Sequence, residues 1–188
     1  MPKNQFQRMI FAFITVVITV HAYVFYSLYV INGSLFIALA SKGGLETTSV
    51  LEAIHAIGGV PMFGRAMPIW AIILIEFACA YVLECVLGSP LSFKLACRKF
   101  DPKNTHPAIF ESAIINATVG IMCPAMSFLA TLFYFPYGYE ALNFWTVMAH
   151  WFKLVIFNFP FAFFTQMYAI QPFVRKLFRT LFARNATA

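Results

Sequence analysis

Residues 68–88 read PIWAIILIEFACAYVLECVLG, and this run decides the fold class of the chain. It is long and apolar enough to cross a bilayer as one helix. It also carries two carboxylates, Glu76 and Glu84. Because an ionisable group inside a bilayer is costly, such residues usually face a partner helix or a water-filled cavity and mark a site. The run therefore predicts a membrane span and a candidate functional position together.

The composition of the whole chain excludes a soluble domain. Of the 188 residues, 61% are hydrophobic, 18% are aromatic and only 11% are charged. These values are typical of an integral membrane protein. The net charge of +6 does not indicate nucleic-acid binding, because the basic residues gather at the ends of apolar runs, where orientation rules and anionic lipid explain them. The lipid bilayer is the partner that the composition predicts.

Four apolar runs predict four transmembrane helices, at residues 9–31, 68–88, 109–133 and 148–170. The second run is expected to end at Gly88-Ser89-Pro90. The longest connection covers about residues 32–67, where Thr47-Thr48-Ser49 precedes apolar positions at helical spacing. This pattern predicts a short amphipathic helix that lies at the membrane surface or caps the mouth of the bundle. The predicted fold class is an all-α membrane protein with four spans and one surface helix.

The distribution of positive charge predicts the orientation of the spans. Cytoplasmic ends carry the excess of Lys and Arg, so the side with more of them is expected to be the cytoplasmic side. Lys153, near the outer end of the fourth span, is expected to extend outward to the interface. Ten basic residues fall on one side and three on the other: Lys3, Arg8, Lys94, Arg98, Lys99, Lys103, Arg175, Lys176, Arg179 and Arg184 against Lys42, Arg65 and Lys153. Both termini are therefore expected in the cytoplasm, and the surface helix outside it.

An internal repeat recurs at a spacing of 82 residues. SPLSFKLACRKF, beginning at Ser89, aligns with QPFVRKLFRTLF, beginning at Gln171, so that the proline, the lysine–leucine pair and the last phenylalanine coincide. The first helices match more loosely at a spacing of 104. We predict two parallel two-helix repeats related by an axis near the membrane normal. The first covers residues 1–104 with the long outer connection, and the second covers residues 105–188 with a basic C-terminal tail.

The spacing of 82 residues places a side-chain amide at the position of each acid. Glu76 matches Asn158, and Glu84 matches Gln166. If the second and fourth spans face each other, each amide can donate a hydrogen bond to its carboxylate. His21, about midway along the first span, is a further candidate for a role beside the acids. All these polar groups can alternatively serve only to join helices.

The C-terminal unit resembles a known kind of membrane protein. NFPFAF, beginning at Asn158, and QPFVRKL, beginning at Gln171, are similar to an uncharacterised bacterial family of small two-helix inner-membrane proteins, a domain of unknown function. The chain resembles a tandem copy of that unit, which implies the bacterial cytoplasmic (inner) membrane. In architecture it is also similar to the bacterial transmembrane pair efflux proteins, which likewise place two helix pairs in tandem. That likeness favours transport as the function.

Three functions are compatible with these residues. In the first, a proton-coupled transporter of a small hydrophobic or cationic compound, Glu76 exchanges protons and Glu84, Asn158, Gln166 and His21 line the path. A carboxyl group in apolar surroundings binds protons more readily than one in water, as such a role requires. The alternative is a non-transporting binding or accessory membrane protein that assembles with a larger complex.

A membrane enzyme is the third possibility, and it has the least support. The sequence contains no nucleotide-binding loop, no paired histidines at metal-ligand spacing and no activated serine or cysteine constellation. We therefore expect no enzymatic activity, no cofactor and no metal ion. Four helices enclose little space, so a homodimer is also expected.

Overall fold

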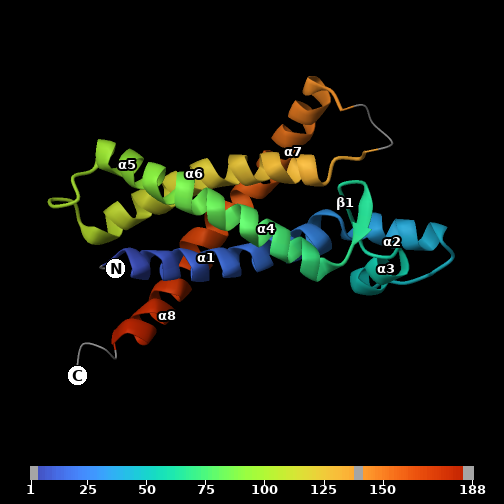
Figure 1. Ribbon diagram of the computed structural model, residues 1–188, viewed down its shortest axis with the longest axis horizontal. Helices are drawn as coiled ribbons and strands as arrows, with labels where there is room; N and C mark the ends of the chain where they lie inside the picture. Colours follow the sequence, from blue (N-terminus) through green and yellow to red (C-terminus); the bar gives the residue numbers. More distant parts are fainter. Residues whose placement is uncertain (1–3, 138–141, 184–188) are drawn as a thin grey trace.

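The structure, a computed structural model, describes residues 4–137 and 142–183. Within these ranges, four helices are long and apolar enough to cross a membrane. Figure 1 shows the last of them, in orange and red, running oblique to the others. The predicted fold class, an all-α membrane protein with four spans, is confirmed. The four spans are Gln5–Ile31, Ile69–Lys99, Pro107–Phe133 and Phe144–Phe182.

Three of the four spans change helix type along their length. The first consists of α1 (Gln5–Tyr26) and the π-helical turn η1 (Ser27–Ile31). The second contains α4 (Ile69–Leu83), the π-helical turn η2 (Glu84–Gly88) and α5 (Ser89–Lys99). The third is the single helix α6 (Pro107–Phe133). The fourth contains α7 (Phe144–Phe164), the π-helical turn η3 (Thr165–Ile170) and α8 (Gln171–Ala183).

The prediction that the second span ends at Gly88-Ser89-Pro90 is wrong. The helix continues through η2 into α5, and Pro90 lies in the first turn of α5. Proline is tolerated in a first turn, but in a regular helix interior its ring clashes with the carbonyl four residues earlier. A wider π-helical turn directly before Pro90 avoids that clash and keeps the span continuous. The same arrangement precedes Pro172 in the fourth span.

The long connection folds into a small cap, residues 33–67, at one end of the bundle (Figure 1). It contains α2 (Gly33–Lys42), α3 (Val50–Ala56) and an antiparallel hairpin of β1 (Val60–Met62) and β2 (Arg65–Met67). α3 is the predicted surface helix, and the Ser49 side chain caps its N-terminus by accepting a hydrogen bond from the amide of Glu52.

Neither α2 nor the hairpin follows from the sequence pattern. The hairpin turns at Phe63 and Gly64, which both have positive φ angles, 53° and 72°. Such a turn normally uses Asn or Asp at its first central position, so Phe63 conceals the signal. The cap shares the core of the bundle, because its almost fully buried apolar side chains belong to the same hydrophobic cluster as Val16 and Ile72 of the first two spans: Phe36, Ala53, Ile54, Val60 and Met62.

The packing of the spans sets up a space in the middle of the bundle. α1 packs against α4, and α6 packs against α7. At the end opposite the cap, α5 packs against α6 and α8 packs against α1. The first and third spans each bury one stripe of side chains at a spacing of four residues: Val16, Val20 and Val24 on α1 with Leu28 on η1, and Val119, Cys123, Ser127 and Thr131 on α6. These stripes, together with side chains beside them, line the central cavity.

Candidate functional site

A cavity of about 730 Å³ lies between the four spans. Ligand pockets usually measure roughly 300–1,000 Å³, so this volume is sufficient for a small molecule. The lining is mainly apolar, and it extends to the cap, where Phe36 and Val60 contribute to it. Four of the five residues selected from the sequence line the cavity: Glu76, Glu84, Asn158 and Gln166.

The carboxylate of Glu76 is held by a residue that the sequence analysis did not identify. The hydroxyl of Tyr134 donates a hydrogen bond of 2.5 Å to Glu76 Oε1. Tyr134 directly follows α6, and the carbonyl of Phe133 just before it accepts a hydrogen bond of 2.7 Å from the amide of Phe63. The rings of Phe63 and Phe133 also touch, with centroids 5.1 Å apart. Two consecutive residues thus connect the cap hairpin to the candidate proton-binding group.

Glu84 occupies the first position of η2, and its side chain lies along its own helix over the residues that follow it. Its Oε1 accepts a hydrogen bond of 2.7 Å from the hydroxyl of Ser89. Its carboxyl group also lies directly over Gly88, where a side chain would collide with it and with the sulfur of Met122. The missing side chain at Gly88 is therefore what makes room for this carboxylate beside the cavity.

The predicted pairing of each amide with a carboxylate is not what the structure shows. Asn158 Nδ2 donates to Ser127 Oγ at 3.3 Å, and Gln166 Nε2 donates to Thr19 Oγ1 at 2.8 Å. The prediction assumed that the second and fourth spans face each other. Instead α7 packs against α6, and η3 contacts α1. The amide of Asn158 therefore meets a hydroxyl on α6, and the amide of Gln166 meets a hydroxyl on α1.

The three π-helical turns present the same side-chain arrangement to the cavity. In each of these turns, a residue at the start of the turn (the first residue of η1 and η2, the second of η3) accepts a backbone hydrogen bond from the amide of the residue five positions later. The side chains of the same two residues are also hydrogen-bonded, and all six residues line the cavity. The pairs are Ser27–Asn32, Glu84–Ser89 and Gln166–Gln171. Because π-helical turns frequently occur at functional sites, their convergence strengthens the assignment of this cavity as the candidate site.

His21 lies outside this site, contrary to the sequence-based expectation. Its ring is exposed on the outer surface of α1 beside Trp70 and Phe77, and its Nδ1 lies 2.7 Å from the carbonyl of Val17. The position of a residue along a span predicts its depth in the membrane, but it does not predict which side of the helix the residue occupies. His21 lies on the side of α1 that faces away from the central cavity. Lys153, which was expected to extend outward to the interface, is exposed and also lines the cavity.

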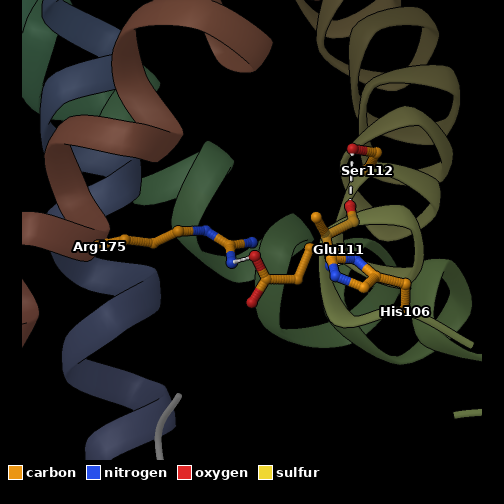
Figure 2. A network of polar contacts seen from close by, with 5 residues as sticks. His106, Glu111, Ser112 and Arg175 are labelled. Atoms are coloured by element: carbon orange, nitrogen blue, oxygen red, sulfur yellow. Dashed lines mark hydrogen bonds and ion pairs between the residues drawn. The ribbon is translucent and has the colours of Figure 1, made fainter.

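A cluster of charged residues lines the cavity near the start of α1 and along α8. We call this cluster the arginine end; it consists of Arg8, Glu111, Arg175 and Arg179. Figure 2 shows Arg175 of α8 extending toward Glu111 of α6, with which it forms an ion pair. Neighbouring polar groups in the same view, His106 and Ser112, are bonded within the first turns of α6.

The residues that the sequence analysis missed had been explained in other ways or not considered. The three arginines were interpreted only as orientation signals, and Tyr134, which directly follows the third predicted span, was not considered. The signal available for α8 was the four-residue spacing of Arg175 and Arg179, which places both on one helix face. No such signal exists for Tyr134, because its partner Glu76 belongs to another span, 58 positions away.

The described residues, 4–137 and 142–183, contain no group of three or more His, Cys, Asp or Glu side chains able to hold a metal ion. The polar groups that line the cavity are carboxylates, amides, hydroxyls, cations, the thiol of Cys123 and the imidazole of His150, on mainly apolar walls. Comparison of the chain with known proteins found no matching family model, no matching curated protein and no matching solved structure.

Proposed function

We propose that this chain is a small integral membrane carrier that exchanges protons for a small hydrophobic or cationic compound. The observation that carries the proposal is the central cavity, which joins apolar walls to the carboxylates of Glu76 and Glu84. Apolar walls favour a hydrophobic body, and a carboxylate favours a positive charge. A site of this composition fits a lipophilic cation.

Glu76 is the proposed proton-exchanging group. It is half-buried, its Oε1 accepts one hydrogen bond from Tyr134, and it lines the cavity that the compound would enter. When a cation binds beside a protonated carboxyl group, it favours loss of the proton, because the cation is attracted more strongly to the ionised carboxylate than to the neutral acid. Binding of the compound and release of a proton are thereby linked. Glu84 would provide a second position along the same path.

The location of the two acids also helps to distinguish a carrier from a non-transporting accessory protein. A non-transporting accessory protein needs the polar groups only to join helices, so its acids can be packed between side chains. Here both acids line a cavity large enough for a ligand. This supports the carrier over the accessory protein. By the charge distribution we further propose that both termini lie in the cytoplasm of a bacterial cell, with the protein in its inner membrane.

The direct test is to measure proton release when a lipophilic cation binds. Purified protein in lipid nanodiscs, in weakly buffered solution, is titrated with tetraphenylphosphonium while binding and pH are recorded. The wild type is expected to bind and to release up to about one proton per cation, by linkage between the two equilibria. Glu76→Gln is expected to abolish the release and to weaken binding. In proteoliposomes, the same substitution should abolish uptake of the cation driven by a pH gradient.

Glu46→Gln is the matched control, because it makes the same chemical change at an exposed position outside the cavity lining. This control should bind tetraphenylphosphonium and release protons as the wild type does. Absence of binding by the wild type would contradict the carrier proposal. Release that persists unchanged in Glu76→Gln would exclude Glu76 as the coupling residue, and Glu84→Gln then tests the second acid.

A further inference from the structure

The arginine end of the cavity has more positive than negative charge. Arg175 and Glu111 form an ion pair between α8 and α6, and their side chains are only 22% and 25% exposed (Figure 2). Arg8 and Arg179 line the same end, and this cluster contains no second acidic side chain. Arg8 and Arg179, which are both exposed, therefore line this end of the cavity without a carboxylate of their own in the cluster.

The fold brings these guanidinium groups together from two helices. Arg175 and Arg179 are four positions apart on α8, a spacing at which like charges disfavour the helix. Arg8 belongs to α1. This helix lies against α8 at the same end, because Phe11, one turn after Arg8, packs edge-to-face against Phe178 of α8 with ring centroids 5.5 Å apart. An anion bound between α1 and α8 would offset this repulsion.

The walls next to the arginines are apolar. Phe11, Phe110, Ile114 and Phe178 line the same cavity as the charged cluster. A free phosphate ion would contact the guanidinium groups but leave this apolar surface unused. A molecule with an anionic head and a hydrocarbon chain would satisfy both parts of the site. In a membrane protein the abundant molecule of this kind is an anionic phospholipid.

We propose that the arginine end is a binding site for the headgroup of an anionic phospholipid. The phosphate accepts hydrogen bonds from Arg8 and Arg179, whose planar guanidinium groups match phosphate geometry. Arg175 stays paired with Glu111 and adds to the positive field. Hydrocarbon next to the headgroup packs against Phe11 and Ile114, which are half-buried and line the same cavity. This inference does not depend on the transport proposal, since a carrier or an accessory protein could hold such a lipid.

The experiment compares two double variants that remove the same number of positive charges. Arg8→Gln with Arg179→Gln changes the cavity, whereas Lys99→Gln with Lys176→Gln changes exposed residues outside the cavity lining. Native mass spectrometry of each purified protein is recorded with added phosphatidylglycerol or phosphatidylcholine. The wild type should retain phosphatidylglycerol at lower lipid concentration than phosphatidylcholine. The cavity pair should weaken phosphatidylglycerol binding roughly tenfold or more, and the surface pair by less than about twofold.

Equal losses in the two double variants would overturn the proposal, because they would show only a diffuse surface attraction. Glycerol phosphate, which has the headgroup chemistry without chains, distinguishes a lipid site from a phosphate site. If it displaces phosphatidylglycerol at equal concentration, the lipid assignment is wrong. If the glutamine pair unfolds, Arg8→Lys with Arg179→Lys replaces it; this pair keeps the charge but loses the planar match and should bind phosphatidylglycerol more weakly than the wild type.

Discussion

At the scale of single residues, the hydroxyl of Tyr134 is the group that holds Glu76 in the cavity. Tyr134→Phe removes this donor and leaves the ring. We expect the free energy of unfolding to fall by about 1 kcal/mol, the usual net worth of one hydrogen bond. The infrared carboxyl band of Glu76, identified by difference against Glu76→Gln, should shift because its oxygen loses a partner.

Tyr137→Phe is the control for Tyr134→Phe. It removes a hydroxyl that donates to the carbonyl of Leu132 at 2.7 Å, near the same end of α6, without touching Glu76. The Glu76 band should be unchanged in this variant. An unchanged band in Tyr134→Phe as well would show that the tyrosine does not position the acid.

At the scale of elements, η2 depends on a glycine that lies under the carboxylate of Glu84. Gly88→Ala would force the carboxylate and the sulfur of Met122 to move, since an added methyl group meets both. We expect a loss of about 1–3 kcal/mol in unfolding free energy, as for other overpacked sites. Thermal unfolding in lipid or detergent measures it.

Gly120→Ala provides the comparison for Gly88→Ala, because Gly120 is also helical but a methyl group there meets nothing within 4 Å. This variant should be neutral or more stable by up to about 1 kcal/mol, given the higher helix propensity of alanine. If both alanine variants unfold alike, the crowding at η2 is not a constraint on the fold.

The predicted repeat has support at the same scale, although it stays a prediction. η2 followed by α5 and η3 followed by α8 fall at matching positions for a spacing of 82 residues, each with proline at the second position of the following helix. Buried positions recur at that spacing, namely Ala80 with Ala162, Gly88 with Ile170, Ser92 with Val174 and Ala96 with Phe178. The buried stripes of the first and third spans match each other when the two spans are aligned with a spacing of 103 residues. This is one less than the spacing of 104 in the sequence alignment.

At the scale of the whole molecule, native Cys97 tests the proposed orientation. It is exposed on α5 among basic residues, so it should lie on the cytoplasmic side. A membrane-impermeant maleimide should label Cys97 only after cells are permeabilised, with the labelled peptide identified by mass spectrometry. A cysteine introduced by Glu46→Cys, in the cap, should be labelled in intact cells. The reverse pattern would place both termini outside the cytoplasm.

The sequence alone determined the fold class and the depth of the polar groups. Apolar length and charge distribution are local properties, so they predict four spans and, in the cap, α3 without any tertiary contact. They also identified Glu76 and Glu84, because a carboxylate in an apolar run is conspicuous wherever it points.

Only the tertiary structure decided which polar groups meet. Direction around a helix and contact between distant segments depend on packing, and the sequence does not encode them locally. His21 turned outward, Asn158 and Gln166 met hydroxyls in place of acids, and Tyr134 reached Glu76 across 58 positions. The cavity itself exists because α1 packs against α4 and α6 against α7, which leaves polar side chains of all four spans facing one shared space.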